Sequence, residues 1–370
     1  MVVDGVEAGA RARPATAEDL ARTLAEAAGD GLAVIPVGGG RALGMGDPPD
    51  RFDLALETGG LDRVIEFSPN DLTVTVEAGI GLEALQAELD RAGQFLPLDP
   101  FGGPGHTIGG LLASGWSGPL RLRYGTARDY LVGLRVALPD GRLARSGGRV
   151  VKNVSGYDLN KLHLGALGTL GVIVEASFKL FPRPLFEATV SLKAPTFEAA
   201  WGEAERALGL RMPPVALELL ADGGEFTLVG RVAGSERGAR RILGELGWET
   251  VPGRVWKEHG DRGAERWARL SIRRGSLAGI LRRLPPAARW IAQPGVGVAH
   301  WFDFDSAEEF RSLRAAIEAE GGSAVLLAAP PEFKRAVGAW GAPPPTVELM
   351  RRLRDAFDPT RTISPGRYLV

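Results

Sequence analysis

The chain has 370 residues, 45% hydrophobic and 24% charged, which are the proportions of an ordinary globular protein with room for two domains. Its 44 basic and 45 acidic residues leave a net charge of −1, which excludes bulk electrostatic attraction to nucleic acid or to an anionic membrane. The absence of cysteine excludes disulfides, thiolate zinc sites and iron–sulfur ligation. No segment reads as a signal peptide or membrane span, so we expect a soluble cytoplasmic protein.

The first hundred residues alternate helical and extended patterns. A helix capped by Thr16 is predicted over 16–29 because polar capping residues precede an apolar stripe that ends at a glycine. A short buried strand follows at 32–37. Alternating apolar and polar residues predict a strand with one buried face over 71–79, and a leucine stripe predicts a helix over 81–93.

Three consecutive glycines follow the strand at 32–37, in "IPVGGGRALGMGDPP" (35–49). A Rossmann fingerprint requires such glycines to open a helix, but the glycines and prolines that follow break any helix, and no Walker A sequence is present. A structural turn and a phosphate-binding nest of backbone N–H groups both remain open. At Gly39 we expect a side chain to forbid a positive φ and to block the approach of a phosphate.

Two further glycine-rich segments follow, at 101–141 and 153–180. From the end of the first, "YLVGLRVALPDGRLARSGG" (130–148) predicts a β-hairpin, because a Pro-Asp-Gly turn separates two extended runs. The second ends in a predicted strand that two prolines close near residue 184.

The second half of the chain has a different sequence pattern. Between 186 and 329, hairpin patterns mix with amphipathic helices, which predicts an antiparallel sheet covered by helices on one face. A Pro/Gly-rich linker at 338–345 precedes a terminal helix and tail.

Together the three glycine-rich stretches resemble the FAD-binding domain of the vanillyl-alcohol oxidase/p-cresol methylhydroxylase family. Within that family the chain resembles the FAD-binding subunits of bacterial glycolate oxidases, and "RWARLSI" and the terminal "DPTRTISPGRY" extend the resemblance into the second half. The implied fold class is α+β: a two-subdomain FAD-binding domain (1–182) plus an α+β cap domain with an antiparallel sheet (183–345). A C-terminal helix and tail (346–370) would return to the FAD domain.

The resemblance also implies which residues contact FAD. "PVGGGRA" fits the pyrophosphate loop, "TIGGLLASG" the segment along the flavin, and "GTLGVIV" the closing signature. Relatives with a covalently bound flavin carry a histidine in the first loop or a cysteine, so noncovalent FAD is implied here. The implied cofactor-binding residues are Pro36, Val37, Gly38, Gly39, Gly40, Arg41, Ala42, Thr107, Ile108, Gly109, Gly110, Ser114, Gly115, Gly168, Thr169, Gly171, Ile173 and Val174.

Oxidation of a 2-hydroxy acid also requires a base for the hydroxyl proton and a cation for the carboxylate. Candidates are few: His300, on a cap strand, is a candidate base, and Arg269 and Arg273 are candidate carboxylate ligands. His106 and His163 read better as residues of the flavin domain, and His259 as part of a charged loop. No residue pattern indicates a metal site.

Three interpretations remain. The family implies a glycolate oxidase subunit that binds noncovalent FAD and works beside a larger flavoprotein subunit and an iron–sulfur subunit, with the 2-hydroxy acid handled only in the complex. A free-standing FAD-dependent dehydrogenase of another 2-hydroxy acid or an alcohol is the second interpretation, and a non-catalytic assembly subunit is the third. Nucleic acid and membrane insertion are not expected.

Overall fold

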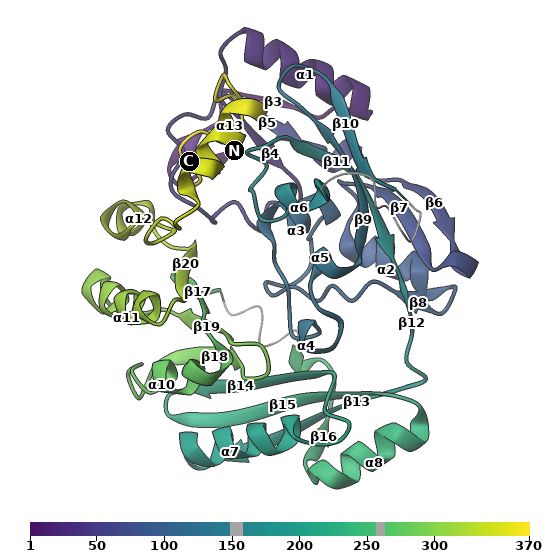
Figure 1. The fold of residues 1–370 in the computed structure, drawn as a ribbon, viewed down its shortest axis with the longest axis vertical. Helices are drawn as coiled ribbons and strands as arrows, with labels where there is room; N and C mark the ends of the chain where they lie inside the picture. The colour runs from purple at the N-terminus through teal and green to yellow at the C-terminus, as the bar shows by residue number, and fades with distance from the viewer. Residues whose placement is uncertain (149–157, 257–262) are drawn as a thin grey trace. The chain divides into compact units, whose positions relative to one another are not determined.

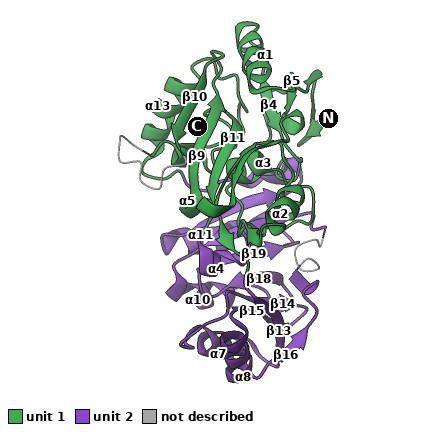
Figure 2. Ribbon diagram, turned by 90° about the vertical axis from the view of Figure 1, so that its right-hand side faces the viewer, with its two compact units in different colours: residues 1–117, 126–183, 343–370 green, residues 118–125, 184–342 purple. Residues whose placement is uncertain are grey.

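A computed structural model describes residues 1–148, 158–256 and 263–370, and these fall into two compact units (Figure 2). Unit 1 comprises residues 1–117, 126–183 and 343–370, and unit 2 comprises residues 118–125 and 184–342. The domain boundaries drawn from the sequence remain a prediction. They differ from the compact units chiefly at residues 118–125, which group with unit 2.

A small parallel sheet, in the order β3-β5-β4, forms the N-terminal part of unit 1 (Figure 1). Thr16 caps the helix α1 as expected, its hydroxyl accepting the N–H of Asp19, and Leu20 and Leu24 are fully buried in the core between α1 and the strands. The elements of this part are β1 (Val2–Val3), β2 (Val6–Glu7), β3 (Ala10–Ala12), α1 (Ala17–Gly29), β4 (Val34–Val37), β5 (Leu54–Glu57) and η1 (Thr58–Gly60).

An antiparallel five-stranded sheet, in the order β10-β9-β11-β7-β6, forms the rest of unit 1. The predicted hairpin is confirmed as β9 and β10, and α13 belongs to this unit although it ends the chain. The elements are β6 (Val64–Ser68), η2 (Pro69–Asp71), β7 (Thr73–Glu77), α2 (Leu82–Asp90), β8 (Gln94–Phe95), α3 (Ile108–Ser114), α5 (Ala127–Tyr130), β9 (Leu131–Ala137), β10 (Leu143–Gly147), α6 (Asn160–His163), β11 (Val172–Lys179), β12 (Phe181–Pro182) and α13 (Val347–Phe357).

The expectation that residues 71–79 form a half-buried strand is wrong, because β7 is buried along its whole length. It lies between β11 and β6, and its polar face is satisfied by side-chain hydrogen bonds. The hydroxyls of Thr75 and Ser177 lie 2.9 Å apart, and Arg63 donates to Glu77 at 2.8 Å. Paired polar side chains can be buried at little cost, so alternation alone does not reveal solvent exposure.

Unit 2 is built on an eight-stranded antiparallel sheet, which confirms the predicted cap architecture. Its order is β16-β13-β15-β14-β18-β19-β17-β20. Alternate residues such as Ala299 and Trp301 join the buried core with the apolar faces of α7, α8, α10 and α11, whereas His300 points to the opposite face. The strands are β13 (Phe186–Ala194), β14 (Ala216–Asp222), β15 (Glu225–Gly234), β16 (Glu249–Val251), β17 (Trp267–Ser271), β18 (Arg289–Gln293), β19 (Val298–Phe302) and β20 (Ser323–Ala328).

The helices of unit 2 are mostly short, and several begin at a serine or threonine cap. Thr196, Ser235 and Ser306 each accept a backbone N–H at the start of α7, α8 and α11. The helices are α4 (Arg121–Tyr124), α7 (Phe197–Leu208), α8 (Glu236–Leu246), η3 (Arg274–Ser276), α10 (Leu277–Leu281), α11 (Ala307–Ala319) and α12 (Pro331–Val337).

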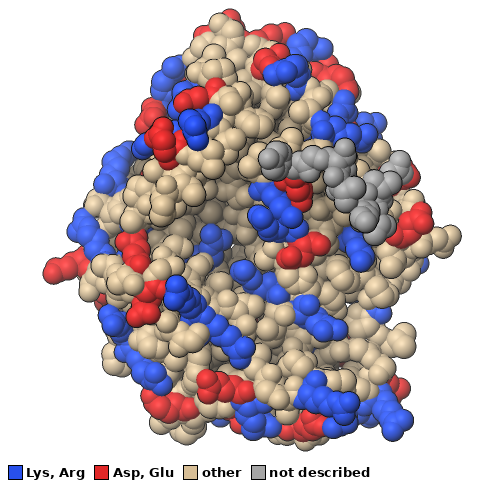
Figure 3. All heavy atoms as spheres, viewed as in Figure 1, with Lys and Arg blue, Asp and Glu red and all other residues tan. Residues whose placement is uncertain are grey.

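Charged side chains of both signs are interspersed over the face drawn in Figure 3, in keeping with the net charge of −1. Within residues 1–148, 158–256 and 263–370, no helix combines the length and apolar character that crossing a bilayer requires.

Candidate functional site

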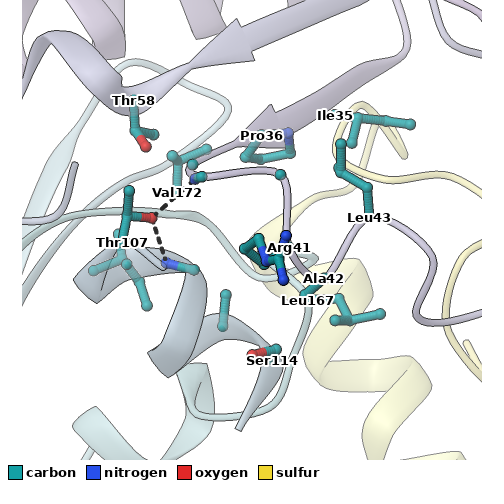
Figure 4. Close-up of a pocket in the computed structure, with 18 of the residues that line it drawn as sticks. Ile35, Pro36, Arg41, Ala42, Leu43, Thr58, Thr107, Ser114, Leu167 and Val172 are labelled. Carbon is teal, nitrogen blue, oxygen red and sulfur yellow. Dashed lines mark hydrogen bonds between the residues drawn. The ribbon is translucent and has the colours of Figure 1, made fainter. Parts of the chain in front are cut away.

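A pocket in unit 1 collects the three glycine-rich stretches around about 800 Å³ of empty space, part of it open to solvent (Figure 4). Most of the predicted cofactor-binding residues line it: Pro36, Gly38, Gly39, Gly40, Arg41, Ala42, Thr107, Gly109, Gly110, Ser114, Gly168 and Ile173. Val37, Ile108, Gly115, Thr169, Gly171 and Val174 do not line it and lie in the adjoining backbone.

The glycine loop follows β4 and continues without a helix, as its sequence predicts. Only Gly40 of the three glycines has a positive φ, of 74°, and a Cβ there would meet nothing nearer than Leu43 at 3.8 Å. The expectation that Gly39 needs a positive φ is wrong, and the expectation that a side chain there blocks a phosphate remains a prediction. The φ of Gly39 is not positive, and a Cβ would lie 1.7 Å from the carbonyl oxygen of Gly105. The close approach of another backbone segment therefore requires glycine at this position.

Thr107 joins the glycine loop to the second glycine-rich segment. Its Oγ1 accepts the N–H of Gly39 at 3.3 Å and the N–H of Gly110 at 3.4 Å, and both bonds are drawn in Figure 4. The second bond caps α3, a helix that sequence reasoning did not foresee between glycines. Gly109 must lack a side chain, because a Cβ would lie 2.8 Å from the Cβ of Ala78. Thr107 thus fixes the distance between the loop and α3.

The third segment closes the pocket through Leu167, Gly168, Val172 and Ile173. It is attached to α3 by the N–H of Leu167, which donates to the carbonyl of Ala113 at 2.8 Å. Part of the signature that suggested this segment, residues 152–157, lies outside the described residues.

Sequence reasoning missed several residues of the lining, above all two from the C-terminal tail. Ser364 and Arg367 line the pocket although the glycine loop lies more than 320 positions earlier. The resemblance of the tail to the glycolate oxidase subunits was the available signal, but it did not place these side chains. The other missed residues are Ile35, Leu43, Thr58, His106, Ala113, Leu167 and Val172.

The described lining holds two arginines, Arg41 and Arg367, and no aspartate or glutamate. His106 also lines the pocket, nine-tenths buried, with its Nε2 2.9 Å from the carbonyl oxygen of Phe101. Burial, and to a smaller degree the charge of Arg41, lowers the pKa of His106. Cationic side chains and glycine N–H groups suit the anionic pyrophosphate of a dinucleotide such as FAD, and apolar walls suit its rings.

Comparison with known proteins agrees with this chemistry. A profile described as "FAD binding domain" matches residues 8–147. The Escherichia coli (strain K12) protein named glycolate oxidase subunit GlcE is 32% identical over 320 residues, which cover 82% of this chain and 84% of that protein. The chain belongs to the family of the glycolate oxidase subunit GlcE. It is therefore one of the FAD-linked oxidoreductases related to glycolate oxidase and D-lactate dehydrogenase.

More distant matches cover less of the relatives. The Bacillus subtilis (strain 168) protein named glycolate oxidase subunit GlcD is 33% identical over 208 residues, or 56% of this chain and 44% of that protein. A solved structure of alkyldihydroxyacetonephosphate synthase superposes with a TM-score of 0.72 at 17% identity, covering 97% of this chain and 77% of that one. This likeness confirms the predicted fold class, an α+β FAD-binding fold with a cap region.

Two of the three candidate catalytic residues lie together in unit 2. Arg269 on β17 and His300 on β19 are cross-strand partners on the face opposite to α7, α8, α10 and α11. Nδ1 of His300 lies 2.9 Å from the indole Nε1 of Trp267. Arg273 lies beyond the end of β17, exposed, and does not join them.

The environment of His300 disfavours its protonation. Burial, followed by the charges of Arg269 and Arg121, lowers its pKa to about 3. Trp267 carries only an N–H donor, so Nδ1 of His300 must be the acceptor and the neutral ring carries its proton on Nε2. A histidine held in this state cannot act as a general base through Nδ1.

The two other histidines among the described residues, His106 and His163, lie in unit 1. His163 is buried beside Phe357 in unit 1, with ring centroids 5.9 Å apart, and burial lowers its pKa to about 4. The prediction that it packs in the flavin-domain core is in agreement with this position. His259 lies outside the described residues.

Proposed function

We propose that this chain is the FAD-binding subunit of a glycolate oxidase complex, in which it carries electrons through noncovalently bound FAD. The observation that carries the proposal is the match to glycolate oxidase subunit GlcE along 82% of the chain. The pocket supports it, because glycine backbone, two arginines and an apolar wall suit the pyrophosphate and rings of FAD. When bound, FAD would supply a two-electron acceptor.

Two features of the chain favour a noncovalent cofactor. The sequence has no cysteine, and the loop Gly38–Ala42 contains no histidine. Among the described lining residues, His106 is the histidine that a covalent flavin link would have to use. Its Nε2 is already engaged with the carbonyl of Phe101.

Within the complex we propose that substrate oxidation depends on partners, a larger flavoprotein subunit and an iron–sulfur subunit. The state of His300 supports this division, because the best histidine candidate for a base is neutral and accepts a hydrogen bond from Trp267. The cluster of Arg269 and His300 would at most bind a small carboxylate without removing a proton from it. A cytoplasmic location remains a further proposal, which cell fractionation would test.

Acid precipitation of the purified chain tests the cofactor. We expect intact FAD in the supernatant, with about one FAD per chain. Flavin that stays with the precipitate would disprove noncovalent binding, and a colourless protein that takes up no FAD would favour an assembly subunit instead.

Anaerobic mixing of the FAD-loaded chain with excess glycolate tests the division of labour. We expect the flavin absorbance to stay unchanged for minutes, and to bleach once the partner subunits are coexpressed and copurified. Bleaching within seconds by the isolated chain would favour a free-standing dehydrogenase, and other 2-hydroxy acids and alcohols would then be compared as substrates.

A further inference from the structure

The C-terminal tail lies against the strand that leads into the glycine loop. The N–H of Val34 in β4 donates to Thr362, and the N–H of Ser364 donates back to Val34, both at 2.8 Å. Val34 and Ile363 thereby form a parallel bridge, and both are fully buried. The tail thus extends the small parallel sheet next to the start of the cofactor pocket.

Arg367 binds the backbone that immediately follows the glycine loop. Its guanidinium donates to the carbonyl of Leu43 at 2.6 Å and also to the carbonyl of Met45. Its own carbonyl accepts the N–H of Asp47 at 3.3 Å. The side chain is only 4% exposed, so these contacts hold residues 43–47 in place from inside the protein.

Ser364 adds a second contact, at a point of backbone strain. Ser364 and Leu167 both line the pocket and both have left-handed φ values, 49° and 50°. Such a conformation is strained for a residue with a side chain. The hydroxyl of Ser364 donates to the carbonyl of Leu167 at 3.4 Å. Strain of this kind persists where the surrounding structure enforces it, and it is concentrated at functional sites.

The charge of Arg367 is the third observation. A guanidinium remains positive when buried, and both hydrogen bonds and nearby negative charge offset the cost of removing it from water. Arg367 lines the pocket together with Arg41, and no aspartate or glutamate is among the described lining residues. Burial lowers its pKa to about 10, and the carboxylates of Asp4 and Asp47 oppose that shift. An anion in the pocket would add to these two carboxylates.

We infer that Arg367 binds the pyrophosphate of FAD, and that tail residues 362–367 form a wall of the cofactor site. This inference rests on the proposed binding of FAD. It assigns to the last residues of the chain a role in cofactor affinity, in addition to their part in the fold.

Titration of the full-length apoprotein with FAD, followed by quenching of flavin fluorescence at low and high ionic strength, tests the inference. Arg367→Gln should weaken FAD binding by roughly tenfold to a hundredfold, because it removes a buried charge from the anion. It should also flatten the dependence of affinity on salt. Arg51→Gln is the matched control: Arg51 also donates to a backbone carbonyl in unit 1, that of Gly31, but is exposed and outside the pocket. It should bind FAD like the wild type.

Arg367→Lys separates charge from fold. It keeps the positive charge but loses the paired hydrogen bonds to Leu43 and Met45, so we expect a lower melting temperature with FAD affinity within about fivefold of the wild type. A lysine variant that binds FAD as poorly as Arg367→Gln would overturn the pyrophosphate contact and leave only a structural role. Equal affinity of Arg367→Gln and wild type would overturn it as well. Failure of the wild-type apoprotein to bind FAD would instead disprove the proposed function.

Discussion

Trp267 donates its indole N–H to Nδ1 of His300 across 2.9 Å, between neighbouring strands of the cap sheet. This bond requires neutral His300 to carry its proton on Nε2. Protonation of Nδ1 would set two donors against each other, in a site that already contains the charge of Arg269. His300 therefore has a protonated Nε2 that can donate a hydrogen bond, and it is a poor candidate for the base.

We therefore predict that His300 remains neutral, as the Nε2–H tautomer, from pH 8 to about pH 4. Chemical shifts of the ring nitrogens in ¹⁵N-histidine-labelled protein would report this directly. Trp267→Phe removes the donor that fixes the tautomer, but the pKa of His300 should stay low, because burial and the charges of Arg269 and Arg121 remain. Titration of wild-type His300 near pH 6.5 would contradict the prediction that burial and the two arginines keep it neutral.

The glycine loop offers a test that a bulky substitution at Gly39 cannot provide, since any side chain there collides with Gly105. Gly40→Ala should lower the free energy of unfolding by about 1 kcal/mol, because alanine is strained at φ 74°. It should also weaken FAD binding, since Gly40 faces the pocket. The control is Gly93→Ala, with a φ of 66° and no atom within 4 Å of the added Cβ.

Denaturant unfolding and FAD titration of both glycine variants would separate strain from binding. Both should lose similar stability, and only Gly40→Ala should lose affinity. Equal FAD affinity in the two variants would indicate that the loop is a structural turn.

We predict that a substitution at Thr107 lowers both stability and FAD affinity. Thr107→Val removes the acceptor shared by the N–H groups of Gly39 and Gly110, at a cost of about 1 kcal/mol in stability. Because the loop and α3 both line the pocket, FAD affinity should fall as well. Thr16→Val removes the equivalent cap from α1, away from the pocket, and should cost similar stability with unchanged FAD affinity. Melting temperatures with and without FAD would distinguish the two.

The glycine segments could be read from the sequence because glycine marks backbone that another segment approaches closely, whichever segment that is. The close approaches at Gly39 and Gly109 show those constraints in the structure. Ser364 and Arg367 could not be placed in the same way, since an ordinary serine and arginine reach the pocket only through the bridge between Val34 and Ile363. The burial of β7 was missed for a related reason: the partners of Thr75 and Glu77, Ser177 and Arg63, are set by tertiary packing.

His163 predicts a pH dependence of stability. Its pKa is about 4 in the folded chain and near 6.5 when unfolded, because burial beside Phe357 disfavours the charged ring. Between these values the unfolded state binds the extra proton, so stability is full above pH 6.5 and falls as pH drops toward 4. The contribution is on the order of 3 kcal/mol.

His163→Met should flatten the stability curve of the chain between pH 6.5 and 4, since methionine packs well against an aromatic ring and does not titrate. Denaturant unfolding across this range, compared with the wild type, isolates the histidine because the carboxylates are common to both proteins. Parallel curves for the two proteins would contradict the assignment.

Asp358 allows a test of whether the cofactor site requires the tail to be held in place. Its carboxylate accepts the N–H groups of Thr362 and Ile363 at 3.0 and 2.8 Å and pairs with Arg354 at 3.4 Å, with both side chains almost fully buried. Asp358→Asn leaves Arg354 buried without its counter-charge, which typically costs 3–5 kcal/mol. If the tail is a wall of the pocket, the variant should also bind FAD more weakly and be cleaved faster by trypsin after Arg361.

Asp355→Asn is the control. Asp355 lies in α13 and pairs with Arg361 of the tail at 2.6 Å, and both side chains are exposed. Exposed pairs contribute about 1 kcal/mol or less, so this variant should match the wild type in FAD affinity. Mass spectrometry of the tryptic fragments and FAD titration of each variant would provide the comparison. If Asp358→Asn frees the tail to trypsin while FAD affinity stays at the wild-type value, residues 362–367 are not part of the cofactor site.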